Sequence, residues 1–243
     1  MFGSRSTTLA TVLFTVALGL PIGARAGALY DGLASLTLTL TAIDGGATIP
    51  TGVAITYAAT VFGQYTNTEG TGSAAAVQTL APGDILEEMS VGDFIGQVSH
   101  SFGQAGEGQG TATSLLQTSG ILFIDNQSGA AVSFSFAYSF SASVEAMLSL
   151  TGVEAMADAT WLLTDDLGLV SLWDGIFADA IAGPSTNTLA LTDSFVILLQ
   201  DGEADWLLSA VDTQGSAGAP EPPAWALLLL GLVLPWVAAR HPA

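Results

Sequence analysis

The chain has 243 residues, with 22 Asp and Glu against 3 Lys and Arg, two His and no Cys. A formal charge of -19 opposes contact with phosphate groups, so the composition excludes a nucleic-acid-binding protein. The lack of Cys excludes disulfide scaffolds, Cys-ligated zinc, iron–sulfur clusters and thiol catalysis. Half of the residues are hydrophobic and only 10% are charged, a balance that predicts a folded chain.

The N-terminus has the pattern of a secretory signal peptide. Arg5 precedes an apolar stretch at residues 9–20, and the small residues Ala24 and Ala26 follow it. The apolar stretch is shorter than the ~20 residues that a membrane span needs. We therefore predict a signal peptide over residues 1–26, cleaved after Ala26, with an uncleaved membrane anchor as the alternative.

Between its two ends the chain mostly alternates apolar and polar residues, which is the period of a β-strand. In chain order, the predicted strands cover residues 36–42, 53–61, 121–124, 132–144, 153–163, 188–192, 194–200 and 203–210. The clearest is 132–144, where Val, Phe, Tyr and Ala alternate with Ser or Ala. We expect its apolar face to lie in a sandwich core, and an exposed aromatic stripe that stacks on sugars is the alternative.

The segments between these strands contain turn, loop and helix signals. Asp201-Gly202 predicts a two-residue hairpin between the last two strands, because type I′ turns favour positive φ at both positions. Gly, Ser, Thr and Gln are frequent at 63–76 and 99–113, which predicts long loops or mobile edges. The segments 84–94 and 172–182 are predicted to form short helices.

Many strands with turns between them and little helix predict an all-β fold, a single antiparallel β-sandwich of the jelly-roll kind. We place this domain at residues 27–213 and a linker at 214–219. Every acid except Glu221 lies in residues 27–219, a part of the chain with no Lys or Arg and with His100 as its one possible cation. Its stability must therefore come from apolar burial, hydrogen bonds and bound cations.

The C-terminus carries a second apolar segment, at residues 224–239, which is followed by Arg240. As a helix this segment would be about 24 Å long, which is a short membrane span. A basic residue after such a segment marks its cytoplasmic end. We therefore expect the bulk of the exported chain to lie on the outer side of the membrane.

Pro220, Glu221 and Pro222 stand directly before this segment. The order of tripeptide, apolar helix and basic end at residues 220–243 resembles the PEP-CTERM sorting signal of Gram-negative bacteria. The resemblance implies that a membrane-embedded exosortase recognises the tripeptide and processes the tail, and that Arg240 belongs to the basic end. It also implies export across the inner membrane, a transient membrane anchor, and a final place at the cell surface or in the exopolysaccharide matrix. A plain C-terminal anchor is the alternative.

No constellation of residues in the body predicts catalysis. His100 lies between two serines, but no Gly-x-Ser-x-Gly elbow accompanies it, and a solvated surface His is the favoured interpretation. Glu87-Glu88 and Asp165-Asp166 are adjacent pairs, and adjacent residues of a strand point to opposite faces. Neither pair is therefore a ready-made carboxylate pair of a glycosidase. We predict no catalytic residues.

Calcium is the one metal that this composition favours, because Ca²⁺ takes oxygen ligands and the body has no competing Lys or Arg. The candidate residues are Asp201, Glu203 and Asp205, which have the 1, 3, 5 spacing of the ligands in a calcium-binding loop. They lack the pattern of an EF-hand loop and its distal Glu, and a simple turn at Asp201-Gly202 is the favoured interpretation. No other cofactor is expected.

These signals together predict an exported protein of the cell surface or the extracellular matrix. Its expected role is non-catalytic: structural, or binding polysaccharide or cations in a biofilm. Two alternatives stay open, an extracellular hydrolase that uses carboxylates and a self-assembling matrix protein that uses the strand at 132–144. The expected partners are the exosortase, the membrane before processing, and extracellular polysaccharide.

Overall fold

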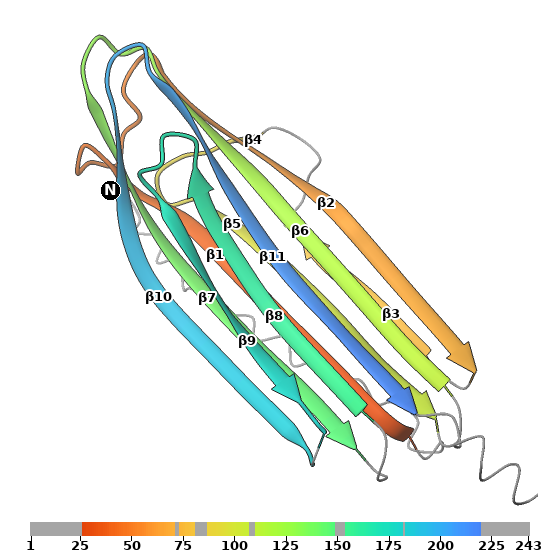
Figure 1. Ribbon diagram of the computed structural model, residues 1–243. Helices are drawn as coiled ribbons and strands as arrows, with labels where there is room; N and C mark the ends of the chain where they lie inside the picture. The colour runs from red at the N-terminus through yellow and green to blue at the C-terminus, as the bar shows by residue number, and fades with distance from the viewer. Residues whose placement is uncertain are drawn as a thin grey trace, which may run out of the picture.

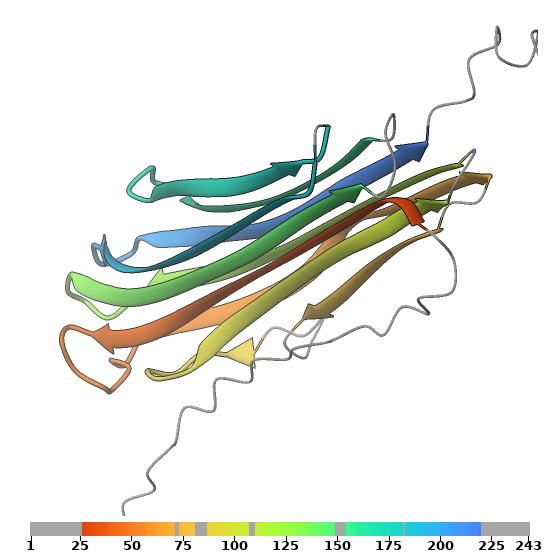
Figure 2. The ribbon, with the colours of Figure 1, turned by 90° about the horizontal axis from the view of Figure 1, so that it is seen from below.

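The computed structural model of the chain is a β-sandwich in which long strands form two layers (Figures 1 and 2). It describes residues 26–70, 73–80, 87–106, 110–148, 154–181 and 183–219. The strands are β1 (Ala26–Ile43), β2 (Val53–Gly70), β3 (Ser73–Leu80), β4 (Glu87–Glu88), β5 (Phe94–Gly106), β6 (Gly110–Asn126), β7 (Val132–Leu148), β8 (Glu154–Asp165), β9 (Ser171–Asp179), β10 (Ser185–Leu199) and β11 (Ala204–Ala219). These described ranges contain no helix, so the predicted all-β class is confirmed.

The two predicted targeting segments fall almost entirely outside the described residues. Ala26 is the first residue of β1, whereas Ala24 and the sorting motif at residues 220–243 are not described. Within the part of the chain that the structure describes, no helix is long and apolar enough to cross a membrane.

Both sheets of the sandwich are antiparallel. The five-stranded sheet has the order β10-β7-β1-β5-β3, and the six-stranded sheet has the order β4-β2-β6-β11-β8-β9. Consecutive strands lie in opposite sheets at every connection except the one between β8 and β9. The chain thus crosses between the layers repeatedly, and most neighbours within a sheet come from distant parts of the sequence.

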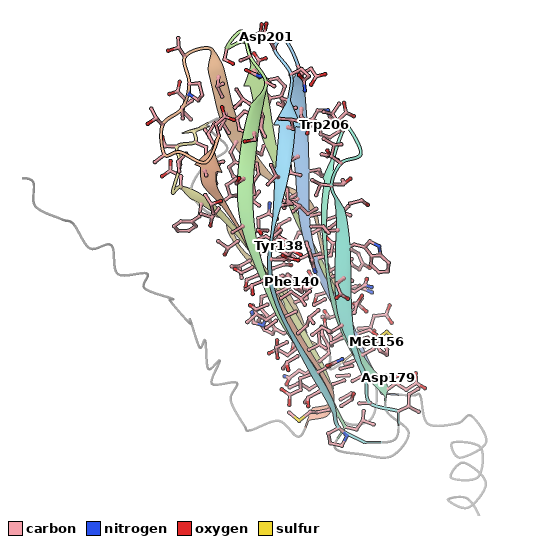
Figure 3. The ribbon with its side chains drawn as sticks, turned by 90° about the vertical axis from the view of Figure 1, so that its left-hand side faces the viewer. Tyr138, Phe140, Met156, Asp179, Asp201 and Trp206 are labelled. Carbon is pink, nitrogen blue, oxygen red and sulfur yellow. The ribbon has the colours of Figure 1, made fainter. Side chains whose placement is uncertain are left out.

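The half of the interior that lies between β7, β8 and β10 is aromatic. Phe136 and Phe140 of β7 are buried, and the outward positions beside them are Ser or Ala. The ring of Trp161 lies 5.1 Å from that of Tyr138 and 5.5 Å from that of Phe140, measured between centroids. Figure 3 shows Tyr138 and Phe140 between the sheets. The apolar face of the strand predicted at 132–144 is therefore core, and an exposed stripe there is ruled out.

The other half of the interior, between β1, β5, β6 and β11, contains hydroxyl and amide groups. Three pairs of buried side chains bridge the two sheets: Tyr30 Oη donates to Ser114 Oγ at 2.8 Å, Gln97 Nε2 donates to Ser209 Oγ at 2.8 Å, and Ser99 Oγ lies 2.7 Å from Thr213 Oγ1. Buried polar groups are tolerated when they are hydrogen-bonded in this way. The pairs therefore hold the two sheets in one relative position.

The two segments predicted as long loops or mobile edges are strands, and the polar interior explains the one at 99–113. The segment at 63–76 does lie at sheet edges, because β3 is the outer strand of its sheet and, among the described strands, residues 63–70 of β2 pair with β6 alone. β2 and β3 cover most of residues 63–76, and β5 and β6 cover most of residues 99–113. Ser101, for example, is fully buried and donates to the carbonyl of Thr213 at 2.8 Å. Gly is depleted in strands, and the strand preference of any residue depends on burial and on its cross-strand partners.

Three other expectations about local structure are corrected. Residues 172–182, predicted as a helix, lie mostly in β9, where pairing with β8 sets the conformation. Within the helix predicted at 84–94, the two residues Glu87–Glu88 form β4 and residues 84–86 lie outside the described ranges. The linker predicted at 214–219 is the end of β11, which pairs there with β6 and β8.

The turn at Asp201-Gly202 joins the two sheets and does not form the predicted hairpin. β10 belongs to the five-stranded sheet and β11 to the six-stranded sheet. The N–H of Glu203 donates to the carbonyl of Gln200 at 3.1 Å, which closes the turn. Gly202 has a φ of 79°, whereas Asp201 is not among the residues with positive φ, so a type I′ turn is also excluded. The turn signal located the strand ends correctly, but not their partners.

Tyr30 fills a space that two glycines leave free. Its ring is buried, and Gly103 stands opposite it on the neighbouring strand β5. A Cβ built at Gly103 would lie 2.6 Å from the ring, and one at Gly215 of the facing sheet would overlap it. Since real Cβ atoms do not approach so closely, β5 and β11 can pack on Tyr30 only because both positions lack a side chain.

Replacing Gly215 by Ala should destabilise the fold by about 1–3 kcal/mol, because the new methyl group forces Tyr30 or the backbone to move. Thermal unfolding of the fragment 27–219 measures the effect. Gly218→Ala on the same strand is the control, since a Cβ there meets nothing within 4 Å. Equal melting temperatures for the two variants would contradict this packing.

Candidate functional site

The three predicted calcium ligands have different hydrogen-bond partners in the structure. Asp201 is exposed and accepts a hydrogen bond from the N–H of Gly129 at 2.8 Å. Glu203 accepts one from the N–H of Gln200 at 2.7 Å, whereas Asp205 is 1% exposed. Among the described residues, no group of three His, Asp or Glu side chains could hold a metal ion. The structure therefore does not bring Asp201, Glu203 and Asp205 together as a calcium site.

Asp205 instead takes part in holding the turn between β8 and β9. Its Oδ1 accepts a hydrogen bond from the N–H of Asp166 at 3.2 Å. Asp165 accepts two more, from Leu169 at 2.9 Å and from Val170 at 2.8 Å. Burial, together with the neighbouring charge of Asp165, raises the pKa of Asp205. The two side chains of Asp165-Asp166 differ in burial, as the strand period predicts, since Asp165 is buried and Asp166 is exposed.

His100 lies on a strand and is hydrogen-bonded to Asp31, so it is not a solvated loop residue. Its Nε2 lies 2.8 Å from Asp31 Oδ1 on the outer face of the five-stranded sheet. The side chain of His100 is 15% exposed, and its ring packs 4.9 Å from that of Phe102, between centroids. Ser99 and Ser101 point to the interior, away from His100. The three residues therefore do not form a catalytic group.

The outer face of the six-stranded sheet carries a row of residues with an aromatic side chain at each end. Strand pairing aligns five outward positions across β9, β8, β11, β6 and β2, in the order Phe177, Asp158, Gln214, Leu115 and Tyr65. In its middle, Gln214 Nε2 donates to Asp158 Oδ2 at 2.9 Å. Since neighbouring strands are about 4.8 Å apart, this aromatic-ended row is roughly 19 Å long.

A second row, beside the first, has a glycine at each end. The same five strands align Gly175, Thr160, Asp212, Gln117 and Gly63. Gln117 Nε2 donates to Asp212 Oδ2 at 3.3 Å. This glycine-ended row therefore presents a hydroxyl, a carboxyl and an amide group with no side chain at either end.

Trp173 lies on the same face of β9 as Phe177, with Gly175 between them. The exposed fractions are 77% for Trp173, 52% for Phe177 and 54% for Tyr65. Large aromatic side chains that stay this open to water mark a contact surface, because their burial by a partner releases free energy. We call the two rows and Trp173 together the binding face, as a candidate site with aromatic residues at its margins and hydrogen-bonding groups in its middle.

The two carboxyl groups of the binding face, Asp158 and Asp212, have pKa values above those of free carboxyl groups. Burial raises the pKa of Asp212 to about 6. The hydrogen bond from Gln117 works against this shift, and the negative charge of Asp158 adds to it. Burial likewise raises the pKa of Asp158. The Oδ1 of Asp212 is buried and has no hydrogen-bond partner in the structure. Near pH 6, Asp212 can therefore donate as well as accept a hydrogen bond.

The sequence pattern does not predict this face. Trp173 and Phe177 lie in a segment predicted as a helix, and Tyr65 lies in a predicted loop. Asp158 and Asp212 belong to strands that only the fold makes neighbours. One signal could have found the aromatic pair: Trp173 and Phe177 are spaced so that both lie on one face of a strand.

Comparison with known proteins adds no family. No protein family model matches the chain, and no curated protein matches it. Among solved structures, the chain is similar to vicilin from Capsicum annuum over 79% of this chain and 73% of that one, with 4% identity and a TM-score of 0.07. A score this low carries no argument about fold or function.

Asp212→Asn should stabilise the fold near pH 7.5 and have little effect below about pH 4. The folded state keeps the proton of Asp212 up to about pH 6, whereas the unfolded chain loses it near pH 3.9. Stability therefore falls as pH rises through this window, and the loss persists above it. We expect the melting temperature of the variant to exceed that of the parent by a few degrees at the higher pH.

Glu154→Gln, on the exposed outer face of β8, is the matched control for the removal of one negative charge. If Asp212→Asn changed the melting temperature by the same amount near pH 7.5 and below about pH 4, the buried carboxyl would be ruled out as the cause.

Proposed function

We propose that this chain is an exported cell-surface or matrix protein that binds a neutral polysaccharide through the binding face. The observation that supports this most directly is the exposure of Trp173 and Phe177 beside a row of hydrogen-bonding side chains. A pyranose ring has an apolar C–H face and a rim of hydroxyl groups. The first fits an aromatic ring, and the second fits the carboxyl and amide groups of Asp158, Asp212 and Gln214.

The shape of the binding face suits an extended ligand. Its rows cross five strands, so a polysaccharide chain can lie along them. The aromatic-ended row places Phe177 and Tyr65 roughly 19 Å apart, so two different sugar rings of one chain can stack on them at the same time. Trp173 lies about 13 Å from Phe177 along the same strand, across the direction of the rows, and offers a further stacking surface at that margin.

The charge of the protein supports a neutral ligand over an anionic one. Residues 27–219 contain no Lys or Arg, and the binding face contains two carboxyl groups. An anionic polysaccharide would be repelled at low salt, with a range set by the Debye length of ~10 Å at 0.1 M. A neutral polysaccharide is bound without that cost.

Trp173→Ala should lower the affinity of the fragment 27–219 for a neutral glucan by about tenfold or more, because it removes the most exposed stacking surface. Affinity electrophoresis through gels that contain the glucan measures the loss. Trp206→Ala is the matched control, since Trp206 lies on the same face, 41% exposed, but outside the two rows.

Equal losses for the two tryptophan variants would contradict the assignment of the binding face. Tighter binding to an anionic polysaccharide as salt is raised, with none to the neutral one, would contradict the ligand class. The rival function, hydrolysis by carboxylates, would use Asp158 and Asp212 of the same face. Release of reducing sugar that stops in Asp212→Asn would favour that rival over a purely binding role.

Export and sorting are part of the proposal and rest on the ends of the sequence. The signal peptide at residues 1–26 supports export across the inner membrane of a Gram-negative bacterium. The resemblance of residues 220–243 to the PEP-CTERM signal supports a transient membrane anchor and processing by an exosortase. A surface position would bring the binding face to the extracellular polysaccharide.

Replacing both Pro220 and Glu221 by Ala should leave the C-terminal tail attached. In cells that encode an exosortase, the variant should accumulate in the membrane fraction at the higher mass of the unprocessed chain, as blots against the body and against an added C-terminal epitope can show. Exchanging Pro235 for Ala within the apolar segment is the control. Unchanged processing of the double variant would overturn the PEP-CTERM assignment.

A further inference from the structure

Strand β10 is a free edge of the five-stranded sheet. It pairs with β7 over all fifteen residues from Ser185 to Leu199 without a register shift, and no described strand pairs with its other side. Native proteins usually protect such an edge with Lys, Pro, a bulge or an inward-pointing charge. β10 has no Lys, Pro or bulge, and its one charged residue is Asp193, which stands at an inward position opposite Tyr138.

The core is also incompletely covered along this edge. Leu189, Leu191 and Phe195 of β10, with Leu172 and Ile176 of β9, pack against the core but are only partly buried. These residues belong to the edge strands β10 and β9 of the two sheets, which contact each other along this side of the sandwich.

The C-terminal end of β10 is also apolar on the outer face of the sheet. Val196 is 58% exposed and Leu198 is 52% exposed. A long unpaired edge beside incompletely covered apolar side chains is the combination expected of a surface that another strand covers.

We infer that the occupant of this edge is a second copy of the same chain, with the two β10 strands paired antiparallel about a two-fold axis. The backbone groups of an antiparallel edge are complementary to their own copy, so one surface serves both partners. The charge pattern favours this contact. The net negative charge of the chain makes two copies repel each other. β10 carries only one carboxylate, Asp193, so this repulsion is weak at the edge itself.

The pairing has a geometric consequence for ligand binding, which rests on the proposed function. A two-fold axis perpendicular to the joined sheet makes a continuous sheet of ten strands from the two copies. The six-stranded sheets then lie on the same side of it, and their binding faces point in the same direction. Two sites fixed in this way bind one polysaccharide surface with an avidity above that of a single site.

The lack of Cys in the chain allows a direct test in the exported, full-length protein. Single Cys residues are placed at the exposed outward positions of β10, and the cells are treated with a short bismaleimide. The positions are Thr186, Thr188, Ala190, Thr192, Ser194, Val196 and Leu198. Ser139→Cys and Ser141→Cys on β7 are the controls, because both positions are exposed and lie opposite Thr192 and Ala190 in the register.

Because a two-fold axis brings equivalent residues together only near its centre, we expect cross-linked dimers to peak at one or two neighbouring positions of β10. Their yield should fall towards both ends of the strand and stay low for the β7 controls. Equal yields on β7 and β10, or no dimer at any position of β10, would overturn the proposal. A cross-link to a different protein would show that the edge has another occupant. The readout involves no sugar, so its outcome is independent of the polysaccharide assay.

Discussion

The absence of Lys and Arg between residues 27 and 219 is the constraint on which the rest of the structure depends. A buried carboxylate here has no cationic side chain of these two types to pair with, and a buried hydroxyl or amide must find a neutral partner. The interior meets this requirement with pairs that cross from sheet to sheet, such as Tyr30 with Ser114 and Ser99 with Thr213. The register of the sandwich is therefore set by neutral hydrogen bonds together with the aromatic half of the core.

The carboxylates obey the same constraint in a different way. Those at the strand ends accept hydrogen bonds from backbone N–H groups: Asp44 from Ser133, Asp165 from Leu169 and Val170, and Asp201 from Gly129. Each of these bonds holds a connection in place. Asp158 and Asp212 are different, because they lie in the middle of strands and are paired with the amides of Gln214 and Gln117. Asp158 and Asp212 lie on a sheet face and have raised pKa values, which distinguishes them from the carboxylates that hold strand ends and makes them candidates for a functional site.

The two outer faces of the sandwich are chemically unlike. The outward positions of β7 are mostly serines, and those of β10 are largely threonine, serine and alanine. The exposed apolar side chains of this face, such as Phe94, Val196 and Leu198, lie towards strand ends. The six-stranded sheet instead exposes Trp173, Phe177 and Tyr65. The proposed ligand on the binding face and the proposed second copy at the β10 edge therefore occupy different parts of the molecule.

The local pattern of the sequence was sufficient for the all-β class, for the buried face of the strand at 132–144, and for the location of the turn at Asp201-Gly202. These features depend on residues that are close in the chain, where the period of two and the turn preferences act. The pattern did not predict the strands at 99–113 and 172–182, and at 63–76 it left a loop and a sheet edge as alternatives. A polar, Gly-rich segment such as 99–113 forms a strand only when a partner strand is present, and pairing with β8 likewise sets the conformation of 172–179.

By itself, the sequence determined the acidic, cation-free body, the period of its strands, and the chemistry that is excluded. Only the tertiary structure decided which residues form a site. It separated Asp201, Glu203 and Asp205, whose spacing suggested calcium, and it placed Asp158 beside Asp212 and both near Phe177 and Trp173. The physical reason is that the chain crosses between the sheets at almost every turn, so neighbours on a face are set by long-range pairing and not by spacing along the chain.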